Sequence, residues 1–78
     1  IRKEKDLGQM QIKLYQLRKE NNVSQERLAD IIGKSSVSYR NKELGRIDFS
    51  SSEMFKIANF FHKSISEIFI DNTSQNVK

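Results

Sequence analysis

The sequence predicts an all-α protein, a five-helix bundle in a single domain. Its 78 residues include no proline and only three glycines, which favours helices with short connections over strands joined by turns. Apolar residues recur at helical spacing along most of the chain, and serines that can cap a helix stand before four of these stretches. A chain this short forms one domain at most, and its core is small.

The chain divides into three parts by composition. Residues 1–6 are mostly charged and are expected to form a flexible N-terminal arm. Residues 7–70 carry the helical patterns and are expected to form the folded domain. Residues 71–78 are mainly polar, and we expect a flexible tail or linker there.

The first predicted helix begins near residue 7 and ends near Glu20. Its apolar stripe consists of Leu7, Met10, Leu14 and Leu17. On a helical wheel Arg18 lies beside this stripe, so its guanidinium is expected at the edge of the core.

Residues 24–45 predict two short helices joined by a tight turn. Ser24 and Ser35 are good N-caps, and Gly33 and Gly45 can adopt the left-handed backbone conformation that ends a helix. The two helices span residues 25–32 and 36–44. A helix, a short glycine turn and a second helix are typical of a helix-turn-helix, which lays its second helix in the major groove of DNA.

The last two predicted helices open with capping boxes, in which a serine and a glutamate three residues later satisfy each other's backbone N–H groups. These boxes are Ser50 to Glu53 and Ser64 to Glu67. The helix after the first box has an apolar stripe formed by Met54, Ile57, Ala58 and Phe61, and the short last helix carries Ile68 and Phe69. In the loop over residues 46–50, Ile47 and Phe49 are expected to be apolar anchors.

Composition limits the classes of function. Fourteen Lys and Arg against ten Asp and Glu give a net charge of +4, a modest lean toward an anionic partner. Without cysteine the chain has no disulfide, thiolate metal site or cysteine nucleophile. His62 is the single histidine and has no second histidine or cysteine at ligand spacing, so we expect no metal site. No glycine-rich phosphate loop is present, and we expect no cofactor. No apolar run is long enough to cross a bilayer and no signal peptide is visible, which favours a cytoplasmic location.

The chain resembles the phage-repressor and Cro-like helix-turn-helix proteins, the XRE family. The segments that carry the resemblance are LRKENNVSQERLADIIG, SSVSYRNKELG and SSSEMFKIANFFHKSISEIF, within about residues 10–70. The resemblance implies a lambda-repressor-like DNA-binding domain whose second and third helices form the helix-turn-helix. It also implies a structural pair, Arg18 and Glu43, that holds the third helix against the first. Where the family often has a large apolar residue before that glutamate, this chain has Lys42, whose stem could cover the core while its ammonium stays in water.

The resemblance places the base-reading residues at the first, second and sixth positions after Ser35. These are Ser36, Val37 and Asn41. Asn41 could bond an adenine edge and Val37 could pack on a thymine methyl group. Arg40 shares their face of the helical wheel and could reach either a guanine or a phosphate, whereas Tyr39 marks the side that faces the core.

Six residues are expected to contact the phosphate backbone. Gln25 begins a helix whose N-terminus offers free N–H groups and a favourable dipole. The others are Lys34, Ser35, Ser38, Lys42 and Arg46, of which the basic residues can neutralise phosphate charge. The alternative for the basic residues is an ordinary solvated face, and Ser35 is first of all a helix cap.

These features predict a sequence-specific, repressor-like transcriptional regulator, bacterial or phage-encoded, that binds an inverted-repeat operator in double-stranded DNA as a homodimer. Phe55, Phe60 and Ile70 are candidates for the dimer face, although they could equally pack beneath loops. No arrangement of residues indicates an enzyme, a small-molecule substrate or a membrane partner. The alternative is a protein-interaction module, such as an antitoxin or an adaptor, built on the same fold.

Overall fold

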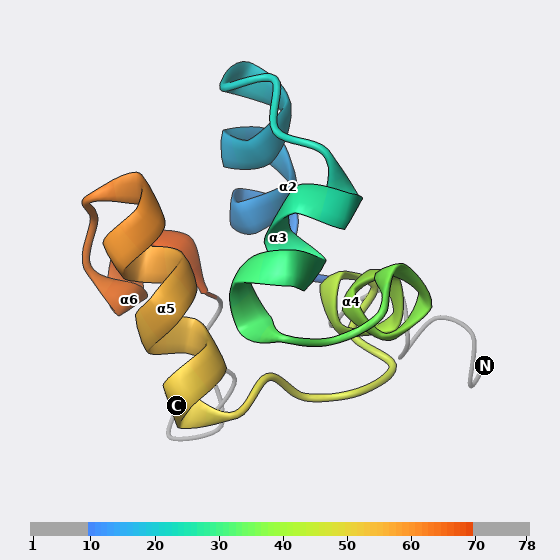
Figure 1. Ribbon diagram of the computed structural model, residues 1–78. Helices are drawn as coiled ribbons and strands as arrows, with labels where there is room; N and C mark the ends of the chain where they lie inside the picture. Colours follow the sequence, from blue (N-terminus) through green and yellow to red (C-terminus); the bar gives the residue numbers. More distant parts are fainter. Residues whose placement is uncertain (1–9, 70–78) are drawn as a thin grey trace, which may run out of the picture.

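The computed structural model describes residues 10–69, which form five helices and no strand. In chain order they are α2 (Ile12–Glu20), α3 (Gln25–Ile32), α4 (Ser36–Glu43), α5 (Ser51–Phe61) and α6 (Ile65–Ile68). Figure 1 shows α3 in the middle, with α4 packed on one side of it and α5 on the other. Within residues 10–69 the predicted all-α architecture with five helices is confirmed. Four predicted features lie outside the described residues: the arm over residues 1–6, Leu7, Ile70 and the tail over residues 71–78.

The first described helix starts later than its apolar pattern predicts. Met10 was expected within the helix, but α2 begins at Ile12, and Gln11 before it has a non-helical ψ of 76°. The backbone N–H of Gln11 donates to the carbonyl of Glu43 at 2.9 Å. A hydrogen bond to the end of α4 therefore takes the place of one more helical turn at this point.

Serine side chains define the starts of α3, α4 and α5. The hydroxyls of Ser24, Ser35 and Ser50 each accept the backbone N–H three residues further on, at 3.0, 3.1 and 3.2 Å. Glu53 completes a capping box, because its carboxylate accepts the backbone N–H of Ser50 at 2.9 Å. Local sequence thus sets where these helices begin.

Helices α2 to α5 all end in the same Schellman turn, in which a left-handed residue lets the next N–H bond a carbonyl five residues back. The left-handed residues are Asn22, Gly33, Gly45 and His62, with φ of 57°, 73°, 85° and 59°. The N–H groups that follow them donate at 2.9 to 3.1 Å. Only two of the four positions are glycine, so α2 and α5 end on residues that carry a steric cost in this conformation.

The apolar core lies where α2, α3, α5 and α6 meet, and includes the fully buried Leu14, Leu28, Ile57 and Ile68.

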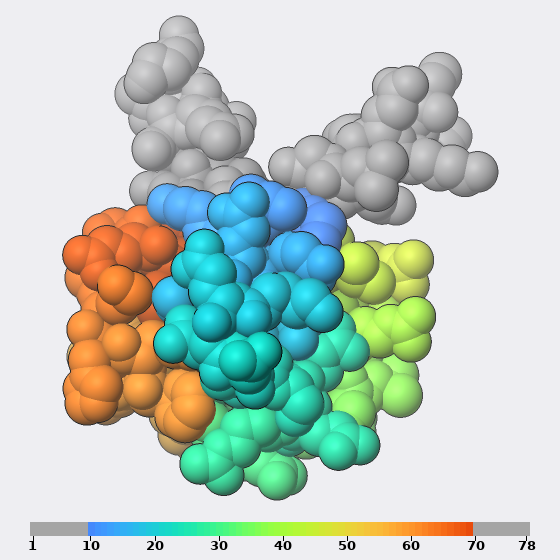
Figure 2. All heavy atoms as spheres, turned by 90° about the horizontal axis from the view of Figure 1, so that it is seen from above, coloured from blue at the N-terminus to red at the C-terminus, as the bar shows by residue number. Residues whose placement is uncertain are grey.

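Tyr39 is the only residue that α4 contributes to the hydrophobic core. Its ring contacts that of Phe49 edge to face, with 5.9 Å between the ring centroids. Phe49 anchors the α4–α5 loop as expected, but Ile47 is 47% exposed. The expectation that Ile47 anchors the loop is therefore wrong. Viewed from above in Figure 2, α2 occupies the centre, with α5 and α6 on one side and the α4 region on the other.

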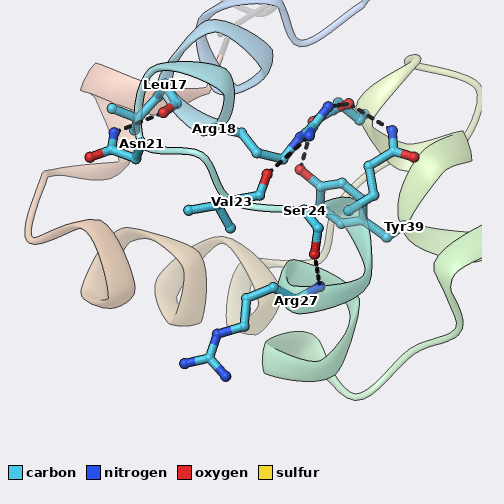
Figure 3. Close-up of polar contacts among 9 residues, drawn as sticks. Leu17, Arg18, Asn21, Val23, Ser24, Arg27 and Tyr39 are labelled. Carbon is cyan, nitrogen blue, oxygen red and sulfur yellow. Dashed lines mark hydrogen bonds and ion pairs between the residues drawn. The ribbon is translucent and has the colours of Figure 1, made fainter.

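A buried carboxylate joins α2, α3 and α4. Glu43, which is 2% exposed, accepts two hydrogen bonds from the Arg18 guanidinium, at 2.8 Å from Nε and 3.1 Å from Nη2. It accepts two more, from the Tyr39 hydroxyl at 2.8 Å and from the Gln25 amide at 3.1 Å. The third Arg18 nitrogen donates to the carbonyl of Val23 at 3.1 Å, and Figure 3 shows Arg18 extending toward that carbonyl and toward Tyr39. The charged side chains of this pair are thus removed from water with their hydrogen bonds made.

The surroundings of this network raise the pKa values of Arg18 and Tyr39. The hydrogen bonds to Glu43 raise the pKa of Arg18 above its usual value, against the opposing effect of burial. Burial, and next the negative charge of Glu43, raise the pKa of Tyr39 well above its usual value. Tyr39 therefore stays a neutral hydrogen-bond donor at any physiological pH.

A second buried ion pair joins α4 to α5. The Lys42 ammonium lies 3.2 Å from the Glu53 carboxylate and donates to the Asp48 carbonyl at 3.2 Å. Burial alone would raise the pKa of Glu53, but hydrogen bonds from the Ser50 N–H and from Lys42 outweigh it and lower that pKa. Lys42 was expected to keep its ammonium in water, and this expectation is wrong because a capping glutamate of α5 lies within reach.

The left-handed residue at the end of α5 predicts a stabilising substitution. His62→Gly should raise the free energy of unfolding by about 1 kcal/mol, because glycine avoids the cost of a Cβ in this conformation. The mirror change is Gly33→Ala, which should cost about 1 kcal/mol, and this cost lies in the backbone because a Cβ there meets nothing within 4 Å. Urea unfolding curves measure both changes. A destabilised His62→Gly variant would show that the imidazole stabilises the fold through its side chain.

The Glu43 network predicts a strong coupling between two residues. Arg18→Met or Glu43→Leu alone should cost about 3–5 kcal/mol, because each leaves one buried partner uncompensated. The double variant Arg18→Met/Glu43→Leu should cost far less than the sum of two single losses. Lys19→Met is the matched control, since it removes an exposed cation from the neighbouring position. Single losses below about 1 kcal/mol by urea unfolding would mean that the pair behaves like an exposed one.

The lowered pKa of Glu53 predicts a stability that depends on pH. A carboxyl group whose pKa is lower in the folded state stabilises the fold above its unfolded pKa, near 4.5 for Glu53, and loses this contribution as the pH falls through the folded pKa. The difference in unfolding free energy between the unsubstituted chain and Glu53→Gln should therefore be largest near pH 7 and shrink toward pH 3. Glu26→Gln, at an exposed position, is the control variant. A Glu53→Gln difference that stays constant with pH contradicts this assignment.

Candidate nucleic-acid interface

One face of α4 is open to solvent. Ser36, Val37 and Arg40 are exposed, and Val37 is exposed by 66% despite its apolar side chain. Asn41 lies on the same face, one turn after Val37, and is half-buried. The structure therefore brings together the four residues that the sequence suggested for base contact, on the side of α4 opposite Tyr39.

Exposed cations flank this face. Lys34 precedes α4, Arg40 lies on it and Arg46 follows it, and all three side chains are exposed. Two ion pairs are recorded in residues 10–69, and neither includes any of these three cations. Their charge is therefore available to an anion.

The two serines near the start of α4 serve the helix itself. Ser35 is exposed and caps α4 by accepting the backbone N–H of Ser38. Ser38 is half-buried on the first turn. Both lie beside the exposed face, at the helix end where the dipole favours a negative charge.

Two residues expected to contact phosphates turn inward. The Gln25 amide nitrogen donates one hydrogen bond to Glu43. An amide NH₂ group has two N–H donors, so this contact uses only one of them. Lys42 is 8% exposed and its ammonium lies on Glu53. The expectation that Lys42 contacts a phosphate is therefore not supported, because the ammonium is buried and paired within the fold.

Several contacts of α4 and its neighbouring residues were not anticipated from the sequence. The Arg46 guanidinium donates to the side-chain oxygen of Asn41 at 3.4 Å, and the Gln25 and Tyr39 side chains both bond Glu43. Tyr39 and Lys42 are three residues apart and so share one side of α4. That spacing was the available signal that Lys42 also faces inward, whereas its partner Glu53 carried no local signal.

Metal-ligating clusters and membrane-spanning helices do not occur in the described part of the chain. No cluster of three or more metal-ligating side chains occurs within residues 10–69. None of the helices in that range has the length and hydropathy needed to cross a membrane.

Three residues were considered for a dimer face. Phe55 is 65% exposed, and Ile70 lies outside the described residues. Phe60 is half-buried, and the Arg27 Cζ atom lies over its ring, 5.5 Å from the ring centroid.

Comparison with known proteins agrees with the observed fold. Residues 14–68 match the model of a family described as helix-turn-helix. This range starts within α2, ends with α6 and covers well over half of the chain. No curated protein and no solved structure matches the chain significantly. The family match, with α3 and α4 as its paired helices, shows that the chain belongs to the Cro- and repressor-like (XRE) family of helix-turn-helix DNA-binding proteins.

Proposed function

We propose that this protein is a sequence-specific, repressor-like transcriptional regulator that inserts α4 into the major groove of an operator. The observation that carries the proposal is the contrast between the two sides of α4. One side is fixed to α2, α3 and α5 through Tyr39, Glu43 and Lys42. The other side exposes short polar and apolar side chains with a cation among them. A helix held rigidly with such a face outward has the geometry for reading bases.

The chemistry of the exposed residues fits base edges. The Asn41 amide has both a donor and an acceptor. The Val37 side chain can pack against the methyl group of thymine, and Arg40 can donate to guanine or to a phosphate. Ser36 can donate or accept and so discriminates less between bases. We propose these four residues as the base-contacting set.

The phosphate contacts in this proposal come from both ends of α4 and from the start of α3. Lys34 and Arg46 supply charge, and Ser35 and Ser38 lie at the N-terminus of α4. Gln25 stands at the N-terminus of α3, where its remaining amide N–H and the helix dipole both favour a phosphate oxygen. Lys42 is not included, because its ammonium is paired with Glu53.

A homodimer on an inverted-repeat operator completes the proposal, which also places the protein in the cytoplasm. One small module buries little surface on DNA, and two linked modules gain affinity without new kinds of contact. Exposed Phe55 on α5 lies outside the proposed DNA face and is the candidate for the contact between protomers. The same exposed ring also suits the alternative function, a protein-interaction module that recognises a partner other than DNA.

Selection of duplexes from a randomised DNA pool, at low and near-physiological salt, tests the proposal. We expect a palindromic consensus at the higher salt, with half-sites about one helical turn apart. Asn41→Ala and Arg40→Ala should each weaken binding to that consensus by roughly 5- to 150-fold, the loss expected for one base contact. Lys56→Ala, which removes an exposed cation from α5, is the control and should leave binding nearly unchanged.

Other outcomes would redirect the assignment. Binding at low salt alone and without a consensus would reduce the interaction to nonspecific charge attraction. A consensus without two-fold symmetry would remove the homodimer. A folded chain that binds no duplex and co-purifies with a protein partner would favour the interaction module.

A further inference from the structure

The turn that ends α4 brings Arg46 back over Asn41. Gly45 has a left-handed backbone with φ of 85°, and its N–H donates to the Lys42 carbonyl at 3.1 Å. The next N–H, that of Arg46, donates to the backbone carbonyl of Asn41 at 2.9 Å. This Schellman geometry fixes the position of the Arg46 main chain relative to Asn41.

The side chains of these two residues then meet. The Arg46 Nη1 atom lies 3.4 Å from the Asn41 Oδ1 atom, and both residues are on the solvent side of α4. A guanidinium has donors and no acceptor, so it can bond only the oxygen end of the carboxamide. The nitrogen end of Asn41 is therefore turned away from Arg46, and a 180° flip of the amide would break this contact.

We propose that Arg46 is a positioning residue that fixes which end of the Asn41 carboxamide is offered to a DNA base. This inference rests on the proposed function and makes it more specific. With its oxygen engaged by Arg46, Asn41 presents its NH₂ group as a donor. Arg46 acts on base choice through Asn41, in addition to any contact with a phosphate.

A fixed donor at this position has a consequence for sequence preference. In the major groove, guanine offers the N7 and O6 acceptors, adenine offers N7 and thymine offers O4, whereas cytosine offers only its N4 donor. Two donors that face each other cannot form a hydrogen bond. The base opposite the Asn41 NH₂ group is therefore expected to be guanine, adenine or thymine, with cytosine disfavoured. An amide released from Arg46 can flip and accept from cytosine.

The test compares two variants that each remove one positive charge. Arg46→Met removes the donor to Asn41. Lys34→Met removes an exposed cation before the other end of α4, and within residues 10–69 no hydrogen bond joins the Lys34 side chain to a base-contacting residue. DNA selection with the unsubstituted chain and with Asn41→Ala identifies the base position read by Asn41. At that position we expect cytosine to be disfavoured roughly tenfold in the unsubstituted chain, within the range for one good base contact.

The expected result is a specific change in Arg46→Met. It should lose most of this discrimination against cytosine, while Lys34→Met keeps it and only binds more weakly at every sequence. Unfolding curves confirm that both variants are folded. If Arg46→Met keeps the discrimination and weakens binding as uniformly as Lys34→Met, the positioning role is overturned and Arg46 is a phosphate contact only. If the unsubstituted chain selects no consensus, the proposed function fails and this inference fails with it.

A measurement on the free protein tests the contact without DNA. Relaxation of the Asn41 side-chain NH₂ group by NMR should show an ordered amide in the unsubstituted chain and in Lys34→Met. The same group should become mobile in Arg46→Met. An amide equally mobile in all three proteins would overturn the inference, whatever the DNA preference.

Discussion

The four hydrogen bonds accepted by the Glu43 carboxylate are the interaction on which the arrangement of this domain depends. Their donors come from α2, from the first residue of α3 and from α4 itself, so one side chain fixes three helices relative to one another. A buried carboxylate without these donors would be strongly unfavourable. The carboxylate thus favours one orientation of α4 over others that would leave it unpaired.

The composition of α4 explains why polar contacts, and not apolar packing alone, fix the orientation of this helix. Within α4 the hydrophobic core receives only Tyr39, whereas α3 contributes Leu28, Ala29 and Ile32. Hydrophobic burial is nondirectional and scales with area, so one aromatic ring defines the orientation of a helix poorly. The Glu43 and Lys42 ion pairs add directional contacts, and they leave the other side of α4 free to expose polar residues.

The residues at the two ends of α4 shape the candidate site as much as those in its middle. Ser35 fixes where the helix starts, and with it which residues lie on the first exposed turn. Gly45 permits the turn that returns the chain over Asn41 and places Arg46 and Ile47 beside it. The loop after the helix is therefore part of the candidate site, a role that the pattern of α4 alone does not indicate.

The sequence by itself determined the helices and their inner and outer faces, because capping serines, left-handed glycines and apolar spacing act over a few residues. It also indicated Arg18 and Glu43 as partners, through the resemblance to a known family. Only the tertiary structure decided that Lys42 is buried against Glu53, that Gln25 bonds Glu43, and that α2 begins after Met10. The reason is physical: these side chains and backbone groups are polar and suit either water or a partner. Whether each of them bonds water or a protein group depends on which residues, often far away in the sequence, packing brings within hydrogen-bond distance.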